Sequence, residues 1–159
     1  MEKSLMSYSD KIVEVPLRLN DAVWEEIQQH AEETYPFECC GFLYGKDGEV
    51  REISHALRAP NSKDGDQRRR FEISGTDYMK AERYALENEL DFLGIYHSHP
   101  DHPALPSQTD LQSALPFFSY IIISVMQGKR AETSSWQLGE EGLFERENIQ
   151  RNINETIIS

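Results

Sequence analysis

The distribution of apolar positions along the chain predicts strands and helices in an irregular order. Residues 11–19 alternate between apolar and polar, which is typical of an opening strand, and Pro16 suits an edge position within it. A helix is expected next, with Asn20 as its N-cap and its end just before Pro36, because the residue before a proline is driven away from helical geometry. The apolar residues of that helix recur at helical spacing: Val23, Ile27 and Ala31.

Between residues 41 and 73 the chain alternates between predicted strands and polar turns. Residues 41–45 are a short apolar strand, and residues 49–57 pair with it as a hairpin across the turn signal Lys-Asp-Gly at 46–48. Residues 59–67 have the composition of a surface loop. Residues 69–73 are then predicted to resume as a strand.

The second half begins with a run of strong helix formers and contains the most apolar strand of the chain. Its predicted elements are a helix that starts between Ser74 and Thr76 and reaches Leu90, a strand at 91–99, a short helix at 107–115 after a proline-rich loop, the apolar strand at 117–126, and two further strands at 134–138 and 142–149.

This irregular order predicts an α/β fold with a central mixed β-sheet flanked by helices. The length of 159 residues suits a single domain, and no internal repeat divides it. We expect the domain to span residues 11–148, between a flexible N-terminus at 1–10 and a C-terminal tail at 149–159. For residues 152–159, packing as an edge and fraying are both open alternatives.

Composition narrows the classes of partner. The net charge of −12 argues against nucleic acid, because such binding requires cations that replace counterions along the phosphates. Neither a long apolar run nor a secretory signal is present, so a cytoplasmic protein without a membrane partner is expected. The adjacent Cys39 and Cys40 are interpreted as two reduced thiols, and they exclude a four-cysteine zinc cage. The oligomeric state is left open by the sequence.

One basic run, Arg68-Arg69-Arg70, interrupts the acidic composition. It fits either a solvated end of the preceding loop or a local docking patch for an acidic protein surface, because charge acts locally as well as in sum.

The segment His97-Ser98-His99 carries candidate metal ligands. On a strand, residues two apart project from the same face, so both imidazoles point toward one place. Asp110, at the start of the helix after the proline loop, is the candidate third ligand, and this set leaves a fourth tetrahedral position open for water. Two alternatives compete: a surface pair of histidines, and a capping box in which Ser107 caps the helix and Asp110 reaches back.

Together these residues form a recognisable pattern. The run HSHP at residues 97–100, followed by Ser107 and Asp110 and preceded by Glu38, resembles the JAMM motif of the MPN+ (Mov34/PAD-1) metalloprotease family. That motif is Glu, then His-Ser/Thr-His-x7-Ser-x2-Asp, and this chain matches every position. The resemblance covers roughly residues 10–138 and implies an MPN fold, which is related to the cytidine deaminases in architecture.

The resemblance also implies a role for each matching residue. His97, His99 and Asp110 would hold one zinc ion per chain, which would lower the pKa of bound water. Glu38 would act as the general base that accepts the proton of this water and returns it to the leaving amine. Ser107 would donate a hydrogen bond to the oxyanion, a role compatible with its capping the helix.

The implied activity is that of a zinc metallo(iso)peptidase. Its substrate would be the C-terminal Gly-Gly tail of a ubiquitin-like or sulfur-carrier protein, because the compact chain is similar to the prokaryotic stand-alone members. Such a thin tail could add as a strand beside an exposed edge, for which residues 68–73 are the candidate. A RadC-like DNA-repair-associated protein and a non-catalytic MPN scaffold are the alternatives. A zinc nucleoside deaminase is disfavoured because the Pro-Cys-x-x-Cys pair is missing.

Several other residues receive only modest assignments. His102 is interpreted as a rim residue of the active-site loop, and Trp136 as a core residue. His30 and His55 are not grouped with carboxylates or cysteines in a candidate site and receive no role. The prolines of that loop, which fix backbone dihedrals, are expected to stiffen it: Pro100, Pro103 and Pro106.

Overall fold

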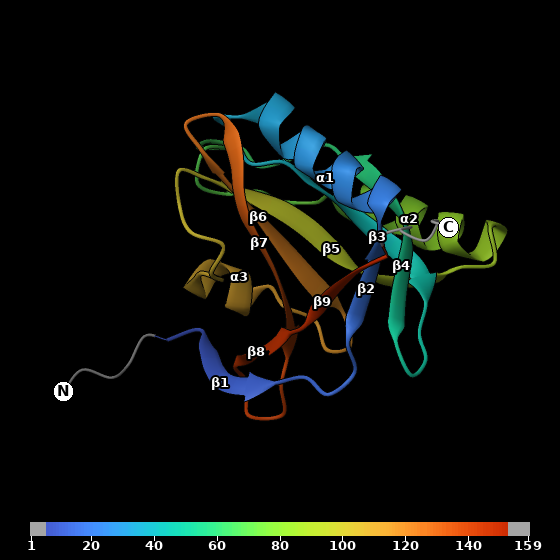
Figure 1. Cartoon of the computed structure of the whole chain (residues 1–159). Coiled ribbons are helices and arrows are strands. Elements are labelled where there is room, and N and C mark those ends of the chain that lie inside the picture. The colour runs from blue at the N-terminus through green and yellow to red at the C-terminus, as the bar shows by residue number, and fades with distance from the viewer. Residues whose placement is uncertain (1–5, 153–159) are drawn as a thin grey trace, which may run out of the picture.

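A curled, mixed sheet of nine strands forms the centre of the computed structural model, which describes residues 6–152 (Figure 1). The predicted α/β class with a central mixed sheet is therefore confirmed. In spatial order the strands are β1 (Tyr8–Ile12), β8 (Phe144–Glu147), β7 (Lys129–Leu138), β6 (Ser119–Met126), β5 (Asp91–Pro100), β3 (Cys40–Lys46), β4 (Arg51–Ala59), β2 (Leu17–Asn20) and β9 (Ile149–Asn152).

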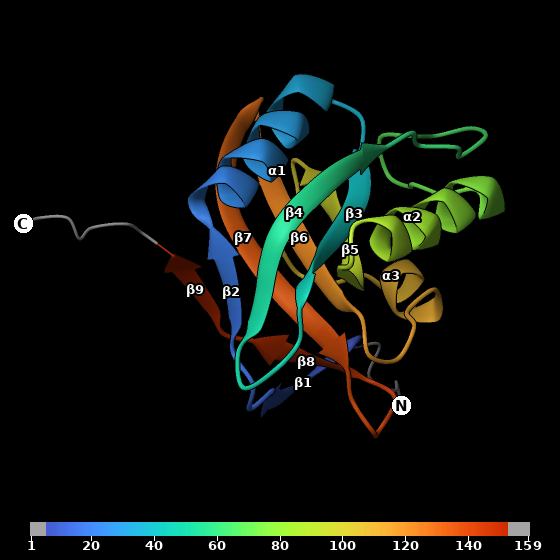
Figure 2. The ribbon, with the colours of Figure 1, turned by 90° about the vertical axis from the view of Figure 1, so that its right-hand side faces the viewer.

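Helices cover both faces of the sheet. Figure 2 shows α1 (Asp21–Thr34) against one face, and α2 (Gly75–Glu87) and α3 (Gln108–Gln112) on the opposite side. Strand β6 is largely apolar because it is buried on both faces: Ile121 and Ile123 pack in the core beneath α1, whereas Ile122 packs in the second core with α2. No helix among the described residues is long and apolar enough to cross a membrane.

The helix starts follow from local capping. The side chain of Asn20 accepts a hydrogen bond from the N–H of Val23 at 2.8 Å, and Ser74 accepts one from the N–H of Asp77 at 3.1 Å. The predicted helices therefore begin where the sequence indicates. The predicted hairpin of β3 and β4 is also confirmed, as an antiparallel pair.

The functionally important connection runs from β5 through α3 to β6. These two strands pair in parallel, so the carboxyl end of β5 and the start of α3 lie near each other. Gly94 allows the strands to approach, because a Cβ atom there would lie 2.0 Å from the carbonyl oxygen of Ser119.

Three predicted strands were wrong in part or in whole. Residues 11–19 are not one strand: β1 pairs with β8, the chain bends at 13–16, and β2 pairs with β4 and β9. Residues 142–149 likewise divide into β8 and the start of β9, with Asn148 between them. The segment at 13–16 and the break at Asn148 lie side by side and connect the outer ends of the curled sheet. Both predicted strands are therefore interrupted there.

Residues 69–73 form no strand. Their backbone groups are bonded instead to the neighbouring loop: the side chain of Asn61 bonds the carbonyl of Arg70 and the N–H of Glu72. The segment 68–73, suggested as an edge for a substrate strand, therefore offers no preformed strand. Regular structure also extends beyond 11–148 at both ends, from Tyr8 to Asn152, whereas residues 1–5 and 153–159 lie outside the described residues.

Candidate metal centre and active site

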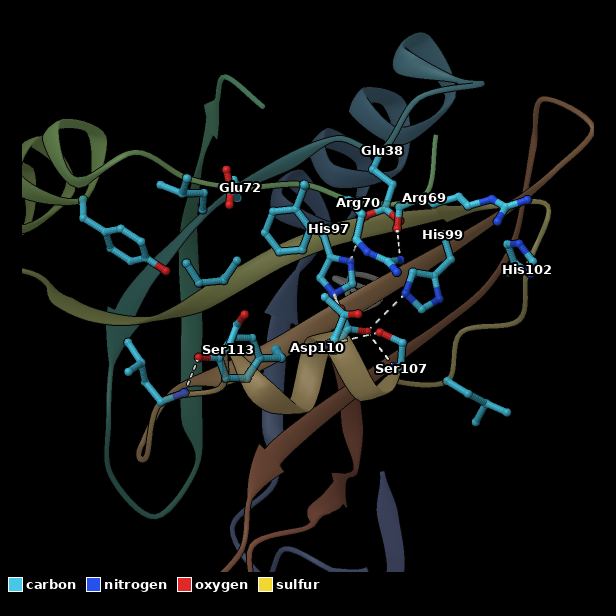
Figure 3. A pocket seen from close by; sticks show the side chains of 18 of the residues that line it. Glu38, Arg69, Arg70, Glu72, His97, His99, His102, Ser107, Asp110 and Ser113 are labelled. Carbon is cyan, nitrogen blue, oxygen red and sulfur yellow. Dashed lines mark hydrogen bonds and ion pairs between the residues drawn. The ribbon is translucent and has the colours of Figure 1, made fainter. Parts of the chain in front are cut away.

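Three predicted ligands converge at the carboxyl end of β5. His97 and His99 project from the same side of the strand and are 1% and 8% exposed, while Asp110 approaches from the first turn of α3 (Figure 3). The Nε2 atoms of His97 and His99 lie 3.5 Å and 3.3 Å from the two carboxylate oxygens of Asp110. One ligand atom from each residue lies within 4.8 Å of the others, so the three could hold a metal ion.

The hydrogen bonds and pKa values around these ligands suit a metal. The Nδ1 atom of His99 lies 2.9 Å from the carbonyl oxygen of Pro103 and must donate to it, which leaves the Nε2 lone pair directed at the centre. Burial lowers the pKa of His97 to about 4, so its imidazole is neutral at physiological pH. Burial opposes ionisation of Asp110, but the neighbouring His97 and His99 outweigh it and hold its pKa well below the ordinary value.

The donor set itself also fits zinc. Two imidazoles and one carboxylate are the ligands of catalytic zinc sites that keep a position open for water. The Nδ1 atom of buried His97 has no hydrogen-bond partner in the described part of the chain and faces Glu38 Oε1 at 3.9 Å. The surface-pair alternative for the two histidines is therefore wrong, since both are buried against Asp110.

Glu38 lies just before β3 and points toward the same centre. It is 6% exposed, and burial is the main cause that raises its pKa to about 8. A cation bound between the ligands would lower this pKa again, because a nearby positive charge favours the carboxylate. Both backbone groups of Glu38 are held by the loop at 61–67: its N–H donates to the carbonyl of Gln67 at 2.7 Å, and its carbonyl accepts from the Asn61 amide at 3.2 Å.

Ser107 caps α3 and faces the same cavity. Its hydroxyl oxygen accepts from the N–H of Asp110 at 3.0 Å, while the Asp110 carboxylate accepts from the N–H of Ser107 at 2.8 Å. The predicted capping box is therefore confirmed. The hydroxyl oxygen is the acceptor in this bond, so its proton can still be donated to another group.

A cavity of about 950 Å³ opens over the metal ligands. One part of its wall is polar and holds the ligands with Glu38 and Ser107. The remainder combines charged side chains, Arg69, Arg70, Glu72 and Glu82, with an apolar part that no sequence signal indicated. The apolar lining residues are Phe71, Ile73, Tyr78, Ile95, Pro103, Leu105, Leu115 and Tyr120.

Two further residues brace the site and were missed from the sequence. Ser98, buried between the two histidines, accepts a hydrogen bond from the N–H of Cys39 at 2.9 Å and so connects β5 to the residue after Glu38. The ring of Phe71 stacks on that of His97, with centroids 4.6 Å apart. Strand alternation could have indicated that Ser98 points away from the histidines, but its partner, 59 positions away, could not be read from local pattern.

Several further assignments can be compared with the structure. Cys39 and Cys40 are free and buried, and burial raises the pKa of each thiol to about 12. His102 is exposed at the cavity, as expected of a rim residue, and Trp136 is buried. His30 is buried in the other core, with Nδ1 2.7 Å from the hydroxyl of Tyr96.

Comparison with known proteins identifies one matching family and several similar proteins. Residues 20–139 match the family model described as prokaryotic homologs of the JAB domain. A desampylase from Pyrococcus furiosus is 31% identical over 107 residues, which cover 65% of this chain and 69% of that protein. A CysO-cysteine peptidase from Mycobacterium tuberculosis is 28% identical over 122 residues, which cover 73% of this chain and 78% of that protein.

A solved structure agrees with the fold. The solution structure of a protein from Desulfitobacterium hafniense has a TM-score of 0.74 and 29% identity, and the match covers 86% of this chain and 92% of that one. The matched range, residues 20–139, contains Glu38 and the three candidate metal ligands. The chain therefore belongs to the JAMM/MPN family, among the prokaryotic homologues of the JAB domain.

Proposed function

We propose that this protein is a zinc-dependent peptidase that hydrolyses the peptide or isopeptide bond after the C-terminal Gly-Gly tail of a ubiquitin-like or sulfur-carrier protein. The observation that carries the proposal is the convergence of His97, His99 and Asp110, with Glu38 3.9 Å from the His97 ring. The names of the desampylase and the CysO-cysteine peptidase support the substrate class.

The mechanism assigns one task to each polar group. His97, His99 and Asp110 would hold one zinc ion, which supplies Lewis acidity and makes water reactive at neutral pH. Glu38 accepts a proton from the attacking water and transfers it to the leaving amine. Ser107 donates a hydrogen bond from its hydroxyl group to the oxyanion that forms at the scissile carbonyl.

The environment of the site supports this division of tasks. The ligands and Glu38 are buried beside apolar side chains of the cavity, so fewer waters screen the charges that develop during the reaction. Burial raises the pKa of Glu38, and a cation held by the ligands would lower it again, so that Glu38 would be ionised and able to accept a proton at neutral pH. Because residues 68–73 form no strand, the substrate tail would run along the cavity rather than extend a preformed sheet there.

The test combines metal analysis with cleavage. We expect one zinc per chain, and cleavage after Gly-Gly in a panel of ubiquitin-fold C-terminal fusions. Glu38→Gln should retain the zinc and lose cleavage by at least about a hundredfold, because a general base contributes roughly that much. Asp110→Asn should lose both zinc and cleavage. Full zinc occupancy without cleavage of any fusion would refute the substrate class, and absence of zinc would refute the metal site. The cytoplasmic location and the lack of a nucleic-acid partner stay predictions from the sequence.

A further inference from the structure

Three consecutive arginines lie beside the proposed active site. Arg68, Arg69 and Arg70 are all exposed, and the last two line the cavity with Glu38 and His99. Figure 3 shows Arg69 and Arg70 on the side of the cavity where Glu38 lies, across from Ser107. The positive field of Arg70 reaches Glu38, since it acts to lower the pKa of that carboxyl against the dominant effect of burial.

These arginines differ from most others of the chain in having few acidic partners. Among residues 6–152, no ion pair joins Arg68 or Arg70 to a carboxylate, and Arg69 approaches Asp66 only to 3.9 Å. Arg83 on α2 and Arg146, which stacks on Trp136, also have no ion pair within the described part of the chain, but each is a single cation. The paired arginines, with N–O distances of 2.8–3.1 Å, are Arg18, Arg51, Arg58, Arg130 and Arg151.

The backbone of the arginine run is held in place next to Glu38. The carbonyl of Gln67, directly before Arg68, accepts from the N–H of Glu38 at 2.7 Å. The amide of Asn61 donates to the carbonyl of Arg70 at 3.1 Å. The three guanidinium groups therefore extend from a fixed backbone, so less conformational entropy is lost when they bind a ligand.

The three arginines contrast with the negative net charge of the whole molecule. A net charge of −12 repels acidic partners and nucleic acid alike at most of the surface. At ordinary ionic strength, however, exposed charges act over about 10 Å, so the three cations act locally on what binds at their part of the cavity, although Glu72 and Glu82 also line it. A short carboxylate-bearing segment fits this pattern better than nucleic acid, whose long line of phosphates would meet the acidic surface around the patch.

We propose that Arg68, Arg69 and Arg70 bind carboxylates of a substrate segment that flanks the scissile tail, and so select acidic carrier proteins. This inference rests on the proposed peptidase function and specifies its partner. The arginines are substrate-docking residues that do not take part in the bond cleavage. Their guanidinium groups suit carboxylates, which they can bind through two parallel hydrogen bonds.

The experiment measures binding separately from cleavage. Two dye-labelled decapeptides, identical except for three glutamates or three glutamines before a terminal Gly-Gly, are titrated with the zinc-loaded Glu38→Gln protein by fluorescence anisotropy. The acidic peptide should bind about fivefold more tightly at low salt, which corresponds to two or three exposed ion pairs. Arg68→Glu/Arg70→Glu should abolish this preference, as should 0.5 M sodium chloride. The matched control, Lys80→Glu/Arg83→Glu on α2, makes the same change in charge at two residues that do not line the cavity and should leave the preference intact.

Each other result overturns the inference. Equal binding of the two peptides, or a preference that survives Arg68→Glu/Arg70→Glu, would show that the arginines do not read carboxylates. Equal loss in the control double variant would assign the effect to net charge. A dye-labelled oligothymidine that binds as tightly as the acidic peptide would indicate a nucleic-acid site instead. Failure of the proposed function is distinguishable, because it would remove cleavage of the fusions while leaving these binding results unchanged.

Discussion

The side-chain amide of Asn61 donates a hydrogen bond of 3.2 Å to the carbonyl oxygen of Glu38, 23 positions earlier in the chain. The same amide also donates to the carbonyl of Arg70, and its oxygen accepts from the N–H groups of Lys63 and Glu72. One polar side chain thus satisfies backbone groups of four residues. The position of Glu38 therefore depends on the loop that carries the arginines.

Asn61→Ala should impair catalysis without removing the metal. We expect kcat to fall about tenfold or more, a typical effect of losing a group that orients an active-site residue, with zinc content unchanged. Asn61→Asp keeps the acceptor oxygen but loses the amide that holds Glu38, so its kcat should fall similarly. The measurement is kcat and KM on a Gly-Gly fusion, with zinc analysis.

A remote asparagine provides the control for Asn61. The side chain of Asn88 donates to the carbonyl of Tyr84 at 2.8 Å near the end of α2, so Asn88→Ala loses a comparable hydrogen bond far from Glu38. It should lower stability slightly and leave kcat unchanged. If Asn61→Ala keeps the wild-type kcat, Asn61 has no part in placing the general base.

Ser98→Ala should destabilise the protein measurably. The substitution leaves the buried N–H of Cys39 without its acceptor, and an unsatisfied buried donor costs about 1–3 kcal/mol. Ser98→Thr retains the hydroxyl and should recover most of that loss. Urea unfolding of the three proteins measures the difference. Equal stability of wild type and Ser98→Ala would mean that another group or water satisfies Cys39.

Gly94→Ala and Gly75→Ala should have opposite effects. A Cβ atom at Gly94 would lie 2.0 Å from the Ser119 carbonyl oxygen, so β5 and β6 would have to separate, at a cost of about 1–3 kcal/mol or more. At Gly75, the first residue of α2, no atom lies within 4 Å of such a Cβ. Gly75→Ala should raise stability by up to about 1 kcal/mol, because alanine favours the helix. Thermal unfolding checks both, and a stable Gly94→Ala would contradict the close approach.

His30 should make stability depend on pH. Burial, assisted by the positive charge of Arg58, lowers the pKa of His30 to about 4 from an ordinary 6.5. Between these values the unfolded chain binds a proton that the folded chain does not, so stability falls as pH decreases from 6.5 to 4. The loss attributable to His30 approaches about 3 kcal/mol at pH 4 and vanishes well above pH 6.5.

His30→Gln isolates this contribution. Glutamine can still bond the hydroxyl of Tyr96, which lies 2.7 Å from His30 Nδ1, but it cannot be protonated in this range. The stability of the variant relative to wild type should therefore increase as pH falls, as measured by urea unfolding at pH 7.5 and 4.5. A constant difference between the two proteins at both values would show that His30 titrates normally when folded.

Features that depend on near neighbours in the chain could be predicted from the sequence alone. The 3.6-residue spacing of Val23, Ile27 and Ala31 predicts α1, and the apolar run of β6 predicts a central strand. The common direction of His97 and His99 follows from the two-residue period of a strand, and the capping box of Ser107 and Asp110 spans only three residues. These predictions are confirmed because the features are set by backbone geometry within one or two turns.

Features that depend on contacts between distant segments became clear only in the tertiary structure. Residues 11–19 alternate like one strand, yet they divide because their partners, β8 and β4, lie at different places in the curled sheet. Residues 69–73 were also predicted as a strand, but Asn61 bonds the carbonyl of Arg70 and the N–H of Glu72, which are then not available for strand pairing. Glu38 reaches His97 only through the pairing of β3 with β5, which places Cys40 opposite His97. Local periodicity carries no information on these contacts, because the register between distant strands is fixed by the packing of the whole sheet.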